Sequence, residues 1–593
     1  MFLLKLRKLM SVGLICCGVL SSSTVALEGM TFDYLRSIGV GSLQRHDRQV
    51  NGQTVSMALV ELSQGNGYDP LAYDFVPNIE HKSLAHVRWR DFYYVDDPNR
   101  PIQYSSHASA IAGILLGWDD AAFIEGIGSF RFQGIAPNLE VDIYEANWFL
   151  FKQVLASAPN FMDCDIVTMS WGTEADNPFT MWWQRGIDAL AERDKIVMVA
   201  GCGNGTDGNI NTISKPSWGY NVISVGVARG LGTFPDCMIY QGTPIRKYSN
   251  WGPTDEGRVK PDVIAPGMFL APSIDSSRAY NCVKQAVGFS SYAAPQVAGV
   301  AALLIDAARQ NDIVHGDDPR VVKALILNGA NKLTGWHKGT CDPADDHSVP
   351  LDYRQGAGMI NAWNSYRQLL SPTDPYWFDD PNYVPGNIGW ILDRVSLDEA
   401  DPNSEKIYLM PESLQSNTDF KATLCWNRHY KDNRLFESQP LNFLALELWS
   451  VDSRGKLQSR LDYSDSIIDN VQHIWYHNNV SQRVALVVTG AGEDPNHFAY
   501  ENFGLAWCDE QENWPGDQMS GDFNADGIVD VRDVVRFIDI WGKHEENPDR
   551  AREALRSRAL SEDVDGDGRI TAEDYDLLSR QWQRRSAWHR PEP

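Results

Sequence analysis

Between residues 50 and 330 the chain alternates short β-branched or apolar runs with longer stretches of helical periodicity. Strands that are buried on both faces appear as continuous apolar runs, and parallel neighbours need a crossover helix between them. Residues 179–193, for example, place tryptophans and aliphatic side chains at helical spacing. The sequence therefore predicts an α/β fold with a doubly wound parallel sheet, and its predicted strands are 56–62, 140–146, 165–171, 195–201 and 221–227.

The character of the chain changes after residue 372, where apolar runs continue without helical stretches between them. Turn-rich polar segments separate these runs, which predicts an antiparallel β-sandwich over residues 373–508. Several domains are expected in any case, because 593 residues exceed the size at which one hydrophobic core stops growing. The predicted strands of the sandwich are 406–409, 421–426, 442–449 and 483–489.

Residues 509–520, an acidic segment with proline and glycine, are predicted to form a linker to a C-terminal module, residues 521–585. Two segments of this module, 521–542 and 562–582, resemble each other. Each segment begins with oxygen-bearing side chains at alternating positions, followed by apolar residues at helical spacing. This pattern predicts a small helical module with two calcium-binding loops, each followed by a helix. The predicted ligands are Asp522, Asn524, Asp526, Asp530 and Asp533 in the first loop, and Asp563, Asp565, Asp567, Thr571 and Asp574 in the second.

The first 26 residues have the order of a secretory signal peptide: basic residues, the apolar run 9–20, then small residues up to Ala26. The apolar run is shorter than the roughly 20 residues of a spanning helix, and no later stretch is expected to span a bilayer. We therefore expect a protein that is secreted or associated with the cell surface. A formal net charge of -26 argues against nucleic acid and anionic membrane surfaces as partners.

Seven cysteines follow this leader, an odd number that leaves at least one thiol unpaired. Two bridges are candidates, Cys237 with Cys282 and Cys425 with Cys508. The sequence alone does not decide between these and other pairings.

Ser291 begins a run of small and apolar residues that is apolar on every face, which predicts a buried helix. Because proline is best tolerated in a first helical turn, Pro295 is expected to lie there. A serine at such a helix start sits where the helix dipole favours an oxyanion, although a plain helix cap is the alternative.

His107 precedes a second small-residue helix, and Asn204 ends a predicted strand in a glycine-rich turn. Each has an ordinary structural interpretation, a packed histidine and a turn asparagine. Together with Ser291 they supply a hydroxyl, a base and an amide donor, which are the groups that serine-based peptide hydrolysis needs.

In this order the three segments resemble the motifs of the subtilisin-like serine peptidases, or subtilases. "HASAIAGI" is similar to the histidine motif, "VMVAGCGN" to the motif of the oxyanion asparagine, and "SSYAAPQVAGVAALL" to the serine motif. Further similar pieces lie at 134–138, 169–172, 248–253 and 260–267, so the resemblance covers residues 40–370. It implies a subtilisin-like peptidase domain within residues 27–372.

The resemblance also implies roles for individual residues. Ser291 would attack the carbonyl carbon and His107 would accept and later return the proton. Asn204 and the backbone N–H of Ser291 would hold the oxyanion. The segment Ser170, Trp171 and Gly172 looks like the strand that pairs with an extended substrate. No cofactor is expected for catalysis.

The acid of the triad departs from the subtilase pattern, because Glu61 stands after the first strand where the family has aspartate. The segment is also similar to the sedolisins, which place glutamate there. Sedolisins carry a further Glu and Asp on the next helix, however, and residues 111–117 contain neither. We therefore expect a Ser-His pair with Glu61 as a substituted acid, and the alternative is a structural carboxylate in a damaged or redesigned site.

The C-terminal module resembles a type I dockerin, which implies a cohesin domain on another protein as its partner. A calcium-folded adhesion module without a cohesin is the alternative. The sandwich loosely resembles the accessory domain of secreted subtilases.

The whole sequence thus predicts a secreted serine endopeptidase attached through its C-terminus. Two other functions stay open: a catalytically inactive subtilase scaffold that binds peptides, and an assembly protein that acts mainly through dockerin pairing.

Overall fold

The computed structural model describes Leu35 and most of residues 38–510. The signal peptide, the linker beyond Glu510 and the calcium loops lie outside the described residues. Within the described range a few single positions are left out, together with the segments 64–72, 96–100, 125–127, 157–160, 205–211, 229–248, 268–269, 273–277, 283–288, 340–342, 372–386 and 493–498.

A sheet of seven strands forms the centre of the first domain, and every neighbouring pair in it is parallel. All five predicted strands are confirmed, whereas β3 and β11 were not predicted. β3 is an edge strand whose residues are exposed or half-buried, three of them charged and three aromatic, and β11 has only four residues. In spatial order the strands are β11 (Val263–Pro266), β10 (Val222–Ala228), β9 (Val197–Gly201), β8 (Ile166–Met169), β1 (Ser56–Glu61), β7 (Glu140–Glu145) and β3 (Arg88–Tyr93).

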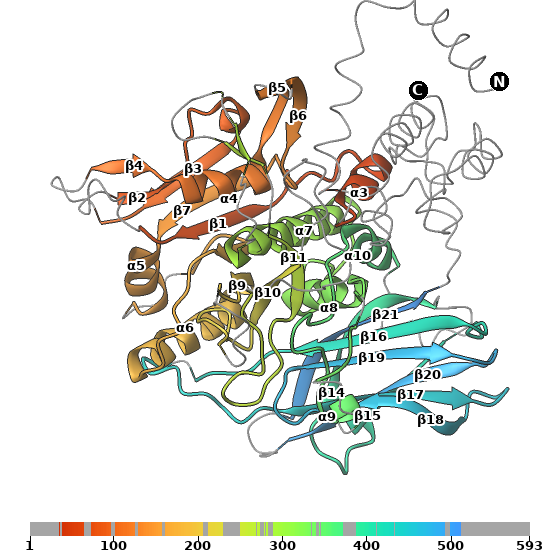
Figure 1. Cartoon of the computed structure of the whole chain (residues 1–593). Helices are drawn as coiled ribbons and strands as arrows, with labels where there is room; N and C mark the ends of the chain where they lie inside the picture. Colours follow the sequence, from red (N-terminus) through yellow and green to blue (C-terminus); the bar gives the residue numbers. More distant parts are fainter. Residues whose placement is uncertain are drawn as a thin grey trace, which may run out of the picture.

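Helices cover both faces of this sheet (Figure 1). Alternate strand residues enter two separate cores, as the pleat of a strand requires: Leu59 belongs to one and Val60 to the other. The first core contains α4 (Ser106–Leu116), α7 (Ser290–Gln310) and α8 (Pro319–Gly329), while the second contains α6 (Pro178–Asp194) and the helical turns α5 (Ala146–Trp148) and η2 (Phe149–Val154). The prediction of a doubly wound sheet is confirmed.

Helix α7 runs through the first core and is buried along most of its length. Among the described residues it is the helix whose length and composition would suffice to cross a membrane, but 89% of its apolar window is buried inside the protein. A helix that is apolar all round and packed on all sides is a core helix of a globular domain.

Short elements complete the first domain. They are α3 (Val40–His46), β2 (Tyr73–Val76), η1 (Lys82–Leu84), β4 (Ile102–Tyr104), β5 (Trp118–Ile124), β6 (Gly128–Gln133), β12 (Leu270–Pro272), β13 (Tyr280–Cys282), α9 (Asp345–Ser348) and α10 (Ala362–Leu369).

The second domain is an antiparallel sandwich of two four-stranded sheets, as predicted. One sheet has the order β14 (Ile388–Ser396), β21 (Tyr500–Glu510), β16 (Thr418–Trp426), β19 (Val471–Asn478). The other has the order β15 (Glu405–Leu409), β20 (Val484–Ala491), β17 (Phe443–Val451), β18 (Leu457–Ser464), and η4 (Pro402–Ser404) precedes β15. The sequence predicted β15, β16, β17 and β20.

The candidate disulfide between Cys425 and Cys508 is wrong. The strand register sets Cys425 opposite Gly504 and Cys508 opposite Lys421, so the two side chains stand apart along the sheet. Cys425 is a free, buried thiol. The other candidate involves Cys237, which lies outside the described residues.

The sandwich packs against α8, which lies between it and the parallel sheet (Figure 1). A Cβ on Gly504 of β21 would come within 2.7 Å of the Arg320 backbone, so only glycine allows this approach. Lys421 Nζ donates to the Ala330 carbonyl at 3.1 Å, a contact that crosses the boundary between the two domains. The two domains are therefore joined by close packing together with buried hydrogen bonds.

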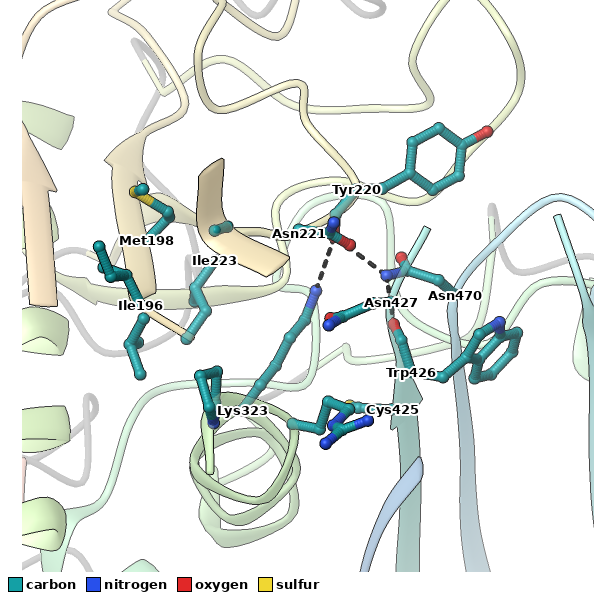
Figure 2. A pocket seen from close by; sticks show the side chains of 14 residues that line it. Ile196, Met198, Tyr220, Asn221, Ile223, Lys323, Cys425, Trp426, Asn427 and Asn470 are labelled. Carbon is teal, nitrogen blue, oxygen red and sulfur yellow. Dashed lines mark hydrogen bonds between the residues drawn. The ribbon is translucent and has the colours of Figure 1, made fainter. Parts of the chain in front are cut away.

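A small pocket lies at this boundary (Figure 2). Lys323 of α8 reaches across it and donates to the Tyr220 carbonyl at 3.3 Å. Asn470 donates to the same carbonyl at 3.1 Å and to the Trp426 carbonyl at 2.7 Å. The polar groups on its wall thus serve to tie the sandwich to the first domain.

Candidate active site

The carboxyl ends of the central strands and the first turns of two helices meet at one edge of the parallel sheet. Glu61 is the last residue of β1, which lies between β7 and β8. His107 and Ser291 are the second residues of α4 and α7. In parallel sheets this edge is where side chains that act on a ligand collect.

Glu61 and His107 form a direct contact. His107 Nδ1 donates to Glu61 Oε2 at 2.7 Å, and the Glu61 residue is only 2% exposed. The Ser105 hydroxyl caps α4 by accepting from the Ala108 N–H, which sets the start of the helix and so the position of His107. The bond at Nδ1 leaves Nε2 as the nitrogen that can accept a proton.

The electrostatics of this pair favour the protonated imidazole. Burial by itself lowers the pKa of His107, but the charge of Glu61 and its hydrogen bond outweigh burial and raise this pKa above the ordinary 6.5. A charge that develops on His107 during proton transfer would therefore be stabilised by Glu61.

Ser291 and Ser170 are linked by two reciprocal hydrogen bonds. Ser291 Oγ donates to the Ser170 carbonyl at 3.1 Å, and Ser170 Oγ donates to the Ser291 carbonyl at 2.9 Å. The described atoms of Ser291 and His107 form no hydrogen bond with each other. To share a proton with His107, the Ser291 hydroxyl must leave the Ser170 carbonyl.

Pro295 explains why Ser170 bonds the backbone of α7. The expectation that Pro295 lies in the first turn is wrong, because the helix begins at Ser290 and Pro295 falls in its second turn. Proline has no N–H, so the Ser291 carbonyl four residues earlier loses its helical partner. The Ser170 hydroxyl takes that place.

Asn204 contacts the residue next to Ser291. Its Oδ1 accepts from the Ser290 N–H at 2.7 Å and from the Ser290 hydroxyl at 3.1 Å. A backbone N–H can only donate, so the atom that faces it must be the amide oxygen. The Asn204 NH₂ is therefore left as a donor, on an exposed residue beside the first turn of α7.

The segment from Ser170 to Gly172 leaves β8 and leads to an antiparallel bridge between Thr173 and Lys215. A Cβ on Gly172 would come within 2.9 Å of the Lys215 carbonyl, so this approach requires glycine. The Trp171 ring lies 5.8 Å from that of Trp183. Among described atoms its buried Nε1 has no hydrogen-bond partner.

The structure thus brings the predicted residues together in two groups, Glu61 with His107 and Ser291 with Ser170, while Asn204 contacts Ser290. Sequence reasoning missed Ser290 and Tyr292, which adjoin the predicted nucleophile. Their position in the serine motif was the available signal. Around such a site, Ser291 can act as a nucleophile, His107 as its base and Asn204 as an oxyanion donor.

Comparison with known proteins finds two matching families in separate parts of the chain. Residues 45–358 match the subtilase family, and residues 520–583 match the dockerin type I domain. Pyrolysin of Pyrococcus furiosus is 25% identical over 399 residues, which cover 54% of this chain and 27% of that protein. Mouse membrane-bound transcription factor site-1 protease is 27% identical over 293 residues, covering 45% and 23%. The chain thus spans about a quarter of the length of these relatives.

Another relative and two solved structures are similar over the same region. Serine protease AprX of Bacillus subtilis is 28% identical over 218 residues, which cover 34% of this chain and 42% of that protein. The structure of the prenylagaramide maturation protease PagA aligns with TM-score 0.36 and 20% identity over 56% of this chain and 98% of its own. The PatG macrocyclase in complex with peptide aligns with TM-score 0.39 and 16% identity over 56% and 97%.

Proposed function

This chain belongs to the subtilase family of serine proteases, and we propose that it is a secreted endopeptidase that uses Ser291, His107 and Glu61. The observation that carries the proposal is the 2.7 Å bond between Glu61 and His107, beside the first turn of the helix that bears Ser291. A carboxylate that fixes one imidazole nitrogen leaves the other for the nucleophile.

Substrate binding would begin the reaction by freeing the nucleophile. In the resting site the Ser291 hydroxyl donates to the Ser170 carbonyl at 3.1 Å. An extended substrate that pairs with residues 170–172 offers its own backbone N–H to that carbonyl. The Ser291 hydroxyl then rotates toward His107 Nε2.

Acylation and deacylation follow from this position. Ser291 Oγ attacks the scissile carbonyl carbon, and its proton passes to His107 Nε2. The C–N bond then breaks as His107 returns the proton to the leaving amine. Water repeats the attack on the acyl ester with His107 as base, which releases the acid and restores Ser291.

The oxyanion formed in each step needs donors that are already in place. The Ser291 N–H lies in the first turn of α7, where backbone N–H groups lack helical partners. The Asn204 NH₂ is the second donor, held in orientation because its oxygen is committed to Ser290. Removing one such side-chain donor typically lowers kcat by about 10²-fold or more.

A fluorophosphonate probe tests this assignment. The full chain should be labelled, Ser291→Ala and His107→Ala should not, and the matched control Ser453→Ala, an exposed serine of the sandwich, should label like wild type. Folded wild type without labelling would instead support the peptide-binding scaffold. Glu61→Ala and Glu61→Asp, assayed on a peptide library, report whether Glu61 is the acid of the triad.

The C-terminal dockerin domain supplies the second part of the proposal. Its donor set consists of oxygen ligands at alternating positions, which is the chemistry that calcium prefers, and calcium would fold the loops. The proposed ligands are Asp522, Asn524, Asp526, Asp530, Asp533, Asp563, Asp565, Asp567, Thr571 and Asp574.

A cohesin domain on another protein is the proposed partner of this module. The full chain should bind a cohesin in calcium and lose binding in chelator, and Asp526→Ala combined with Asp567→Ala should bind weakly in both. If retention on cohesin is the same with and without calcium, the proposed attachment is wrong.

We further propose the division of the chain into a removed leader, residues 1–26, a peptidase domain, 27–372, a sandwich, 373–508, a linker, 509–520, and the module 521–585. Export to the cell surface or medium follows from the leader. Sequencing the N-terminus of the exported protein tests the first boundary, because a mature chain that still begins at Met1 contradicts it.

A further inference from the structure

Tyr292 places an aromatic ring next to the imidazole of His107. The two ring centroids lie 5.8 Å apart and their planes meet at 33°. Tyr292 is the third residue of α7, directly after Ser291, so its backbone belongs to the same first turn as the proposed nucleophile. The ring therefore connects the serine helix to the histidine helix.

Two further contacts fix this ring in place. The Phe289 ring packs against it edge to face, with centroids 5.8 Å apart and planes at 85°. The backbone of Tyr292 is held as well, since its N–H donates to the Phe289 carbonyl at 3.0 Å and its carbonyl accepts from Gln296 at 3.0 Å. A ring held from its backbone and from one neighbour acts as a rigid wall for His107.

The electrostatic surroundings keep the Tyr292 phenol uncharged. Burial raises the pKa of the Tyr292 phenol, and the negative charge of Glu61 raises it further. Glu61 is also the charged group that acts on His107. Near neutral pH Tyr292 thus stays protonated and does not compete with Glu61 for the His107 proton.

A single hydrogen bond leaves an imidazole free to swing about it. Glu61 fixes Nδ1 of His107, and the structure describes no hydrogen bond at Nε2. A ring beside the imidazole restricts this swing and keeps water away from the Glu61–His107 contact, where lower polarity strengthens the interaction.

We propose that Tyr292 is a positioning residue that holds the His107 imidazole in line between Glu61 and Ser291. The proposal rests on the proposed function, because it assigns Tyr292 a task in proton transfer from Ser291. In this role Tyr292 acts through the orientation and hydration of His107.

The test compares the full chain with Tyr292→Ala, Tyr292→Phe and a matched control, Tyr500→Ala, which removes a tyrosine that is 38% exposed on β21. Hydrolysis of a peptide substrate is measured across pH. For Tyr292→Ala we expect kcat to fall about tenfold or more with KM changed less than about twofold. Tyr292→Phe keeps the ring and should retain wild-type kcat within about twofold, as should Tyr500→Ala.

The pH profile separates positioning from simple packing. Opening the site to water weakens the influence of Glu61 on His107, so the acid limb of kcat/KM in Tyr292→Ala should move down toward the ordinary 6.5. An unchanged acid limb and kcat in folded Tyr292→Ala overturn the proposal, as does a loss in Tyr292→Phe equal to that in Tyr292→Ala. If Tyr292→Ala does not fold, Tyr292→Leu replaces it with the same expected direction.

The same experiment distinguishes failure of the proposed function from failure of the proposed role of Tyr292. Wild type that neither hydrolyses peptide nor takes up a fluorophosphonate overturns the proposed function and this inference with it. If wild type is active and Tyr292→Ala has the same kcat and the same acid limb, only the proposed role of Tyr292 is overturned.

Discussion

Two partly buried contacts between histidine and glutamate occupy different parts of the molecule and are built differently. His107, at the edge of the parallel sheet, bonds one carboxylate through Nδ1. His429, at the boundary between α6 and the sandwich, bonds two carboxylates. Its Nδ1 contacts Glu192 of α6, and its Nε2 bonds Glu501 of β21 at 2.7 Å.

The difference shows what each histidine can do. Burial by itself lowers the pKa of His429, but its hydrogen bonds to Glu192 and Glu501 and the charges of these carboxylates outweigh burial and raise the pKa to about 10. With both nitrogens committed, His429 stays charged near neutral pH and ties the two domains together. His107 has one partner and one nitrogen without a described bond, so it can take up and release a proton.

A matched pair of substitutions should separate the two roles most strongly in activity. His107→Gln removes the proposed base, and we expect kcat/KM to fall by roughly 10³-fold or more. His429→Gln should keep kcat/KM within about threefold, because it lies outside the proposed site. Initial rates on one peptide substrate at neutral pH give both values. Equal losses in the two variants would break the comparison.

For stability we expect the opposite order, with the larger effect from His429→Gln. His429→Gln leaves Glu501 buried without its charged partner, and we expect the free energy of unfolding to fall by about 3 kcal/mol. Asn442 still donates to Glu501 at 2.5 Å and limits the loss. His107→Gln also leaves a buried carboxylate, Glu61, without its partner, but it breaks one ionic hydrogen bond where His429→Gln breaks two, so a smaller loss of about 2 kcal/mol is expected. Urea unfolding of both variants measures the difference, and a more stable His429→Gln would contradict it.

Much of the fold was open to prediction because strand burial leaves a signal in short sequence windows. β1, β8, β9 and β10 are buried and mostly apolar, and β7 is buried although it carries Glu140, Asp142 and Glu145; all five were found. The edge strand β3, none of whose residues is fully buried, lacks this signal. So does β18, whose residues are mostly exposed or half-buried. Periodicity detects burial, so strands that are barely buried escape it.

The candidate site was predictable only where a motif named its residues. Glu61, His107, Ser291 and Asn204 came from ordered motifs, and the contact of Glu61 with His107 follows from the sheet edge they share. The partners of His429 could not be predicted, because Glu192, His429 and Glu501 are far apart in the sequence and meet only when the sandwich packs on α6. The position of Pro295 was mispredicted because the sequence does not reveal that the Ser170 hydroxyl, just after β8, donates to the Ser291 carbonyl that Pro295 leaves without a helical partner.

The pH dependence of stability sharpens the comparison further. The folded state holds a proton on His429 up to about pH 10, whereas the unfolded chain releases it near 6.5. Stability from this contact is therefore complete below about 6.5 and is lost as pH rises through about 10. Glu192 from α6, Glu501 from β21 and Arg320 from α8 are the charged groups that face one another here.

Unfolding free energies of wild type and His429→Gln at about pH 6, 8 and 10 measure this effect. The gap between the two proteins should narrow as pH rises. A gap that stays constant over this range would mean that His429 contributes by packing and not by charge.

The smallest expected effect concerns the hydrogen bond from Ser170 to the Ser291 carbonyl at 2.9 Å. Ser170→Ala leaves that carbonyl without a donor and should lower the free energy of unfolding by about 1 kcal/mol. Pro295→Ala restores a backbone N–H within the helix, so the further change to Ser170→Ala should cost less in that background. A double-mutant cycle by urea unfolding gives the coupling. If the effects of the two substitutions on the free energy of unfolding simply add, the Ser291 carbonyl does not depend on the Ser170 hydroxyl. The hydrogen bond at the sheet edge would then contribute less to stability than the ionic contacts of His429 at the domain boundary.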